Sequence, residues 1–159
     1  MNWGDFMSVS SRLAGLGIEL PNPPQAVAAY VPAVVSGSWC YTSGQIPFKD
    51  GELLAKGRVG AEVTTEQAYQ AARQCALNAI SVAAAAVGDI NRLVRVIKVV
   101  GWVQSADHYH EQSQVINGAS ELLGEIFGEA GQHARSALGT NALPLDSALE
   151  VEVIFEVKL

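Results

Sequence analysis

Apolar and polar residues alternate regularly between Leu149 and Leu159. A period of two sends successive side chains to opposite faces of a β-strand, so this segment is predicted to be a strand. One face is predicted to join the core: Leu149, Val151, Val153, Phe155, Val157 and Leu159. The other face should meet solvent or a polar cavity: Glu150, Glu152, Ile154, Glu156 and Lys158.

A second strand is predicted from Arg92 to Val103, where β-branched residues alternate with charged ones. We expect this strand to lie inside the sheet rather than at its edge. A strict period of two divides it into two faces: Val94, Val96, Lys98 and Val100 against Leu93, Arg95, Ile97 and Val99.

Two segments are predicted to form long helices. The first begins after Thr64, whose side chain can accept the N–H of Gln67 while Gln67 reaches back, and it ends at Gly88. It is rich in alanine, which implies close approach to a sheet. The second helix is predicted over residues 107–127, where glycines interrupt the pattern.

The N-terminal part and the connections form shorter elements. Residues 5–17 are predicted to be a helix, and residues 19–24, with three prolines, an extended linker. Residues 30–35 and 39–43 form a hairpin with Gly37 in its turn. The other predicted elements are a turn at 47–51 with Asp50-Gly51 as its strongest signal, a short strand or bulge at 52–56, and a strand at 135–140.

This order predicts an α+β fold, with a mixed sheet and two helices packed on one of its faces. The opposite face of the sheet would then be bare. Hydrophobic residues make up 49% of the chain and charged residues only 16%, so much apolar surface needs covering. The sequence therefore predicts self-assembly through the bare face.

Charge and cysteine content narrow the possible partners. The formal net charge of −6 and the absence of a Lys/Arg run argue against nucleic acid as a partner. No segment is apolar for long enough to span a membrane, and no signal peptide is apparent, so a cytoplasmic protein is expected. Cys40 and Cys75 are expected to be buried, reduced thiols.

Arg135 is the side chain that most directly indicates a ligand-binding function. It lies in a run of small and apolar residues, and Glu150 follows it beyond a Leu143-Pro144-Leu145-Asp146 turn. A guanidinium can donate two parallel hydrogen bonds to one carboxylate, which is the geometry that small 2-oxo or 2-imino acids require.

Several motifs resemble the RidA/YjgF family of 2-iminobutanoate/2-iminopropanoate deaminases, whose members often carry an endoribonuclease L-PSP label. They are Tyr30, the Thr42–Pro47 segment TSGQIP, Asn117, the Ala134–Ser136 segment ARS, Leu143-Pro144 and the Glu150–Glu152 segment EVE. The resemblance covers residues 28–159 as one domain, and residues 1–27 form an N-terminal extension outside it. It implies a chorismate-mutase-like fold and a homotrimer with ligand clefts between subunits.

The resemblance also implies roles for individual residues. Arg135 matches the arginine that clamps a substrate carboxylate, and Glu150 matches the acid that orients water near the imine carbon. The other matches are Tyr30 and Ser43 as hydroxyls of the cleft, Asn117 as its amide, and Ala137 where many deaminases have cysteine. The backbone N–H of Ala137 can still bind a carboxylate oxygen. The implied ligand is a small 2-imino or 2-oxo acid, with no metal or organic cofactor.

Other interpretations stay open from the sequence. Arg135 could serve only a structural ion pair, and Glu150 could be a solvated strand residue; if the two were close, the pKa of Glu150 would be lowered. The helical spacing of His108 and His110 sends them to opposite sides, which argues against a metal site. No serine or cysteine is expected to have a partnered base.

The extension, Ala137 and the Gly139–Asn141 segment indicate a divergent subgroup of the family. A non-catalytic trimer that binds small carboxylates or acts like a chaperone is therefore an alternative. An endoribonuclease is a further one, which the acidic composition disfavours.

Overall fold

The computed structural model describes residues 7–24 and 29–159. Residues 5 and 6 of the predicted N-terminal helix, and the predicted domain boundary between residues 27 and 28, lie outside this part. The elements are α1 (Val9–Leu16), β1 (Ala33–Ser36), β2 (Trp39–Thr42), β3 (Phe48–Lys49), β4 (Glu52–Leu53), α2 (Thr65–Val87), β5 (Leu93–Gln104), α3 (Gln112–Phe127), β6 (Ala134–Thr140) and β7 (Leu149–Val157). Short 3₁₀ turns occupy Ile90–Arg92, Gly128–Gly131 and Pro144–Asp146.

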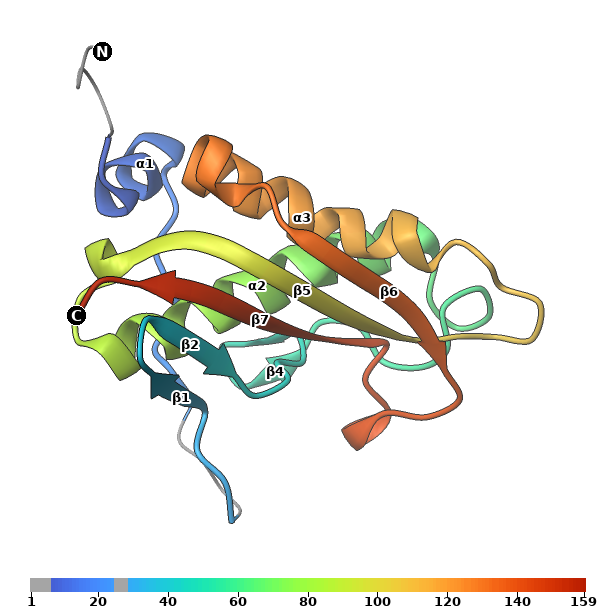
Figure 1. The fold of residues 1–159 in the computed structure, drawn as a ribbon. Coiled ribbons are helices and arrows are strands. Elements are labelled where there is room, and N and C mark those ends of the chain that lie inside the picture. Colours follow the sequence, from blue (N-terminus) through green and yellow to red (C-terminus); the bar gives the residue numbers. More distant parts are fainter. Residues whose placement is uncertain (1–6, 25–28) are drawn as a thin grey trace.

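Five strands form one mixed sheet in the order β1-β2-β7-β5-β6. Only β5 and β6 are parallel, and the other pairs are antiparallel. Helices α2 and α3 lie together on one face of this sheet (Figure 1). The predicted α+β fold, with a mixed sheet and two helices on one face, is therefore confirmed.

The hairpin β3-β4 stands apart as a two-stranded sheet. Asp50 and Gly51 connect its strands with positive φ values of 52° and 83°, which is the backbone conformation that such tight turns require. The predicted Asp50-Gly51 turn therefore has the expected position, although it joins one more strand than the sequence indicated.

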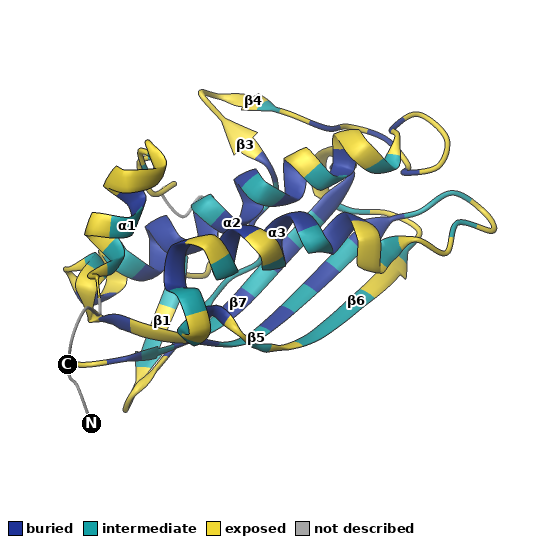
Figure 2. Ribbon diagram, turned by 90° about the horizontal axis from the view of Figure 1, so that it is seen from above, coloured by how far each residue is buried: buried dark blue, intermediate teal, exposed yellow. Residues whose placement is uncertain are grey.

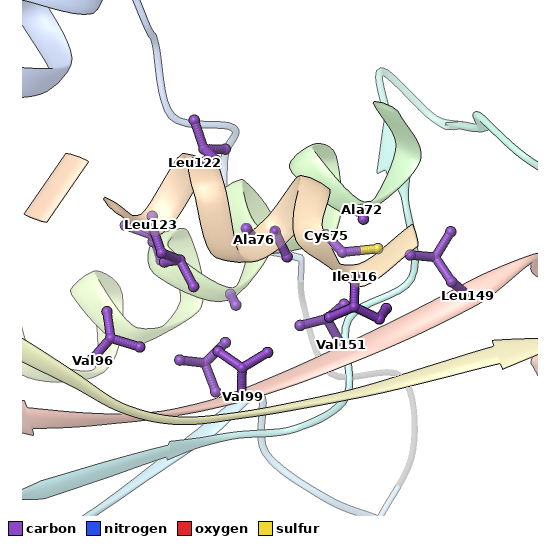
Figure 3. Packing of buried hydrophobic residues seen from close by; sticks show 14 of the residues in the cluster. Ala72, Cys75, Ala76, Val96, Val99, Ile116, Leu122, Leu123, Leu149 and Val151 are labelled. Carbon is purple, nitrogen blue, oxygen red and sulfur yellow. The ribbon is translucent and has the colours of Figure 1, made fainter. Parts of the chain in front are cut away.

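The core lies between the two helices and the sheet, as Figure 3 shows for its central residues. Alternate residues of β7 from Leu149 to Val157 are buried, as predicted, whereas Leu159 lies beyond the strand and is exposed. Two glycines permit close packing in this layer. A Cβ on Gly118 of α3 would lie 2.1 Å from the backbone oxygen of Tyr69, and a Cβ on Gly101 would overlap Ile116.

Strand β5 does not keep the predicted division into two faces. Its pairing with β7 shifts register between Leu93 and Arg95 and again between Val96 and Lys98. Each irregularity adds one residue to β5, so the buried positions near the strand's start are three apart rather than two. The predicted central position is confirmed, because β5 lies between β7 and β6.

The helix predicted from residue 107 begins later, at Gln112. His108 adopts a φ of 63°, which is incompatible with a right-handed helix. The segment before α3 is instead held by Tyr109, whose hydroxyl lies 2.9 Å from the Thr65 hydroxyl at the start of α2. Helix α2 begins with the predicted capping box of Thr64 and Gln67.

Helix α1 packs beside the end of α3 and the turn before β5 (Figure 1). Its Ser8 cap and its left-handed Gly17 define its ends, and Leu13 is buried against the core. The linker that follows is anchored as well, because the Ser81 hydroxyl donates to the Pro21 carbonyl at 2.5 Å. These contacts hold residues 8–21 against the helical layer.

The face of the sheet opposite the helices is partly apolar. Figure 2 shows how buried and more exposed residues alternate along its strands. Val34, Tyr41 and Leu138 are exposed, and Ile154 and Trp102 are half-buried in register with them. Within the described parts of the chain, no helix is both long and apolar enough to cross a bilayer.

Candidate functional site

Arg135 points from the edge strand β6 toward helix α3. It lies opposite the buried Val99 of β5, so its side chain leaves the sheet on the helix face. Its Nη1 donates to Oδ1 of Asn117 at 2.8 Å and to Oγ of Ser120 at 3.2 Å. Asn117 and Ser120 are three residues apart on α3, and this spacing brings both to the side of the helix that faces β6.

His133 extends this cluster. Its Nε2 lies 2.9 Å from the Ser120 Oγ, and its Nδ1 lies 2.6 Å from the Gly131 carbonyl oxygen. The expectation that no serine has a partnered base is therefore wrong. The sequence contained only a weak indication of this contact. Ser120 lies three residues after Asn117 in a helix, so the two share a helix face. His133 lies two residues before Arg135 beside a strand, so these two also share a face.

We call this cluster of Asn117, Ser120, His133 and Arg135 the arginine half. It lines a cavity of about 370 Å³ between α3 and the start of β6. The cavity is completed by Gly124, Gly131 and Gln132. A Cβ on Gly124 would have no neighbour within 4 Å, which leaves this end of the cavity open along α3.

Ala137 lies two residues after Arg135 and on the same face of β6. It pairs with Gly101 and packs partly buried against the core. Strand β6 has β5 as its one neighbour in the sheet, so its outer edge carries backbone N–H and C=O groups that face away from the sheet.

Glu150 lies in β7, on the face of the sheet opposite the helices. It pairs with Trp102 and alternates with the buried Leu149 and Val151. Its carboxylate lies against Gly44, where an added Cβ would come within 1.7 Å of Glu150 Oε1. Burial, and to a lesser degree the charge of Glu152, raise the pKa of Glu150. A lowered pKa was expected only if Arg135 were close to Glu150, and within one chain it is not.

Ser43 precedes Gly44 at the end of the first hairpin, and Tyr30 lies in the segment before β1. The Ser43 hydroxyl donates to the Val31 carbonyl at 2.7 Å, which ties the end of β2 to the segment that carries Tyr30. The Tyr30 side chain is 54% exposed. We call Tyr30, Ser43 and Glu150 the glutamate half.

Within one chain the two halves are separate. Arg135 pairs with Val99 and Glu150 with Trp102, so β5 lies between them and they are three residues apart along it. Strand geometry then places their Cα atoms about 14 Å apart. Their side chains also leave opposite faces of the sheet, so the fold does not bring Arg135 and Glu150 into contact within one chain.

Within residues 7–24 and 29–159, no three His, Cys, Asp or Glu side chains lie close enough together to hold a metal ion. Cys40 and Cys75 are both buried and unpaired with each other, and burial raises the pKa of each thiol.

A mixed sheet in this strand order, with two helices on one face, defines the chorismate-mutase-like class of α+β folds. The family described as "YjgF/chorismate_mutase-like, putative endoribonuclease" matches residues 10–157. The chain belongs to this family, the RidA/YjgF family that its motifs resemble.

Individual relatives agree with this assignment. Protein TCP17 of Trypanosoma cruzi is 41% identical over 150 residues, which cover 94% of each chain. The structure of Atu1372 from Agrobacterium tumefaciens, described as a protein of unknown function, matches 96% of this chain and 94% of its own with a TM-score of 0.87 and 40% identity. E. coli TdcF, solved with bound serine, matches 87% of this chain and 94% of its own with a TM-score of 0.62 and 26% identity.

Proposed function

We propose that the protein hydrolyses reactive 2-imino acids to 2-oxo acids and ammonia in a cleft between subunits of a homotrimer. The observation that supports this proposal most strongly is the arginine half, where a guanidinium lines a cavity of about 370 Å³. A guanidinium fixed in this way suits a planar carboxylate. TdcF was solved with bound serine, a small molecule that also carries a carboxylate.

Assembly is part of this proposal because one chain keeps the two halves apart. A cleft that contains both would take the arginine half from one subunit and the glutamate half from the next. The apolar residues on the bare face, Val34, Tyr41 and Leu138 among them, give a second chain surface to bury. The homotrimer itself comes from the family resemblance and is tested by measuring the mass of the protein in solution.

In the proposed reaction water adds to the carbon of a protonated imine, and the C–N bond then breaks to leave a ketone and an ammonium ion. Arg135 would hold the carboxylate, and Glu150 would accept a proton from the attacking water and pass it to the nitrogen before the C–N bond breaks. A carboxylate within hydrogen-bond reach of that water can act as its general base. Tyr30 and Ser43 would line the cleft, and the Ala137 N–H would bind a carboxylate oxygen.

The test is release of 2-oxobutanoate and ammonia from freshly generated 2-iminobutanoate. Arg135→Ala is compared with wild type and with Arg58→Ala, which removes an arginine from an exposed ion pair. A hydrogen bond to a charged group contributes about 1.5–3 kcal/mol, so kcat/KM should fall about tenfold or more in Arg135→Ala alone. Equal acceleration by wild type and Arg135→Ala would exclude the proposed role of Arg135.

Two other functions give different results in the same set of measurements. A protein that only binds small carboxylates would bind 2-oxobutanoate through Arg135 without accelerating imine hydrolysis. An endoribonuclease, the activity in the family's description, would cleave RNA and lose that activity in Arg135→Ala. The net charge of −6 does not favour binding to a polyanion.

A further inference from the structure

The hydrogen bonds of the arginine half all run in one direction. Arginine only donates, so Oγ of Ser120 must accept from Nη1 of Arg135. A carbonyl only accepts, so the His133 Nδ1 must carry a hydrogen and donate it to the Gly131 oxygen at 2.6 Å. In a neutral ring Nε2 is then the acceptor, and the Ser120 hydroxyl donates to it at 2.9 Å.

We infer that Ser120 and His133 are positioning residues that fix the guanidinium of Arg135 and so select the edge that binds a carboxylate. The inference deepens the proposed function and rests on it. Nη1 has two hydrogens, and Asn117 and Ser120 accept them. Nε and Nη2 have no hydrogen-bond partner among the described residues, so their shared edge is the one presented to a ligand.

This arrangement matters because Arg135 lies on an edge strand beside an open cavity. A long side chain in such a place has many rotamers, and ordering it on binding weakens affinity. Two acceptors on α3 order it beforehand. The Ser120 hydroxyl donates its own hydrogen to His133, which turns the oxygen's lone pairs toward Arg135 so that it accepts a hydrogen bond from the guanidinium. The Gly131 carbonyl in turn orients the His133 ring.

A nucleophilic role for Ser120 is the competing interpretation, because a hydroxyl 2.9 Å from a histidine nitrogen can be activated. Two observations favour positioning. Ser120 lies within α3, where backbone N–H groups are used by the helix and cannot stabilise an oxyanion. Its oxygen also accepts a hydrogen bond from Arg135, which reduces its nucleophilic character.

The first test measures geometry without a ligand. Two-bond ¹H–¹⁵N NMR at about pH 8, where an ordinary histidine is neutral, reports which ring nitrogen carries the hydrogen. His133→Phe assigns the signal. A hydrogen on Nδ1 is expected, and a hydrogen on Nε2 would overturn the inference. ¹⁵N relaxation of the Arg135 Nε should show greater mobility in Ser120→Ala than in wild type, and unchanged mobility would also overturn it.

The second test measures binding of 2-oxobutanoate by calorimetry and the kinetics of 2-iminobutanoate hydrolysis. Ser120→Ala and His133→Phe should each weaken binding roughly tenfold, the scale of one hydrogen bond to a charged group. KM should rise with little change in kcat, because a clamp holds the ground state and the transition state alike. Ser120→Thr, which keeps the hydroxyl, should retain most of the affinity. Ser113→Ala, an exposed serine of the same helix, is the matched control.

The outcomes separate the inference from the proposed function. If Arg135→Ala abolishes binding while Ser120→Ala and His133→Phe bind as wild type does, the positioning role is wrong and the clamp stands. If Arg135→Ala also binds normally, the proposed function fails. Covalent labelling of Ser120 by a fluorophosphonate, with loss of kcat rather than a rise in KM in Ser120→Ala, would replace positioning with nucleophilic catalysis.

Discussion

Two glycines of α3 should respond in opposite ways to the same substitution. Gly118 lies between α3 and α2, where a Cβ would come 2.1 Å from the Tyr69 backbone oxygen and 3.2 Å from the Ala72 Cβ. Gly124 lies in the same helix, and a Cβ there would have no neighbour within 4 Å. Gly118→Ala and Gly124→Ala therefore add the same methyl group to the same helix, at a crowded site in Gly118→Ala and at an open site in Gly124→Ala.

The free energies of unfolding follow from two terms. Alanine favours a helix over glycine by about 1 kcal/mol, which benefits both variants. In Gly118→Ala the new methyl group meets a backbone carbonyl, which cannot rotate away, so α2 and α3 must separate. Overpacking of this kind costs typically about 1–3 kcal/mol and sometimes more. We expect Gly124→Ala to be about 0.5–1 kcal/mol more stable than wild type, and Gly118→Ala to be roughly 1–3 kcal/mol less stable than Gly124→Ala, because the helix term is common to both.

Thermal unfolding followed by far-UV circular dichroism measures the difference. At this chain length 1 kcal/mol corresponds to about 2–4 °C, so the two midpoints should differ by roughly 2–12 °C. All variants are compared at one protein concentration, because assembly would make Tm depend on concentration. A Gly118→Ala variant as stable as Gly124→Ala would show that the close contact between the helices is absent or adaptable.

Two further predictions concern buried titratable groups. Burial raises the pKa of Glu150 in the folded protein, so ionised Glu150 destabilises the fold as pH rises above the ordinary glutamate pKa of about 4.3. Glu150→Gln should therefore unfold at a higher urea concentration than wild type at neutral pH. If this advantage did not shrink toward pH 4, burial of the ionised carboxylate would not be its cause. Burial also raises the pKa of Cys40 and Cys75, so both thiols should react with a disulfide reagent only after denaturation. Rapid labelling of either thiol in native protein would show that its site opens.

The elements that the sequence predicted well are those with strong local signals. The alternation in β7, the capping box of α2 and the Asp50-Gly51 turn each depend on a few neighbouring residues, and each has the predicted form. The faces of β5 were wrong because its two register shifts depend on the partner strand β7, which a period within β5 does not report. The start of α3 was wrong because the Tyr109 contact with Thr65 competes with helix formation.

The candidate site was predictable only in its individual residues. Arg135 and Asn117 were both identified from motifs, and in the structure Nη1 of Arg135 lies 2.8 Å from Oδ1 of Asn117. The separation of Arg135 from Glu150 depends on strand order, which the sequence did not reveal. Because of it, burial rather than an arginine sets the direction of the Glu150 pKa shift. The Ser120–His133 contact joins a helix to a strand edge, and no local pattern marks it.

The position of β7 in the sheet has a consequence for how the protein is made. Strand β7 follows the other four strands of the sheet in the chain and is synthesised after them, yet it joins β2 on one side to β5 on the other. Before it appears, the hairpin β1-β2 and the pair β5-β6 have no shared hydrogen bonds, and the apolar groove between them stays open. The sheet therefore closes only after β7 has been synthesised, through contacts far apart in the chain, which slows folding and exposes strand edges meanwhile. A chain stopped before residue 149 would leave two half-sheets rather than a smaller version of the fold.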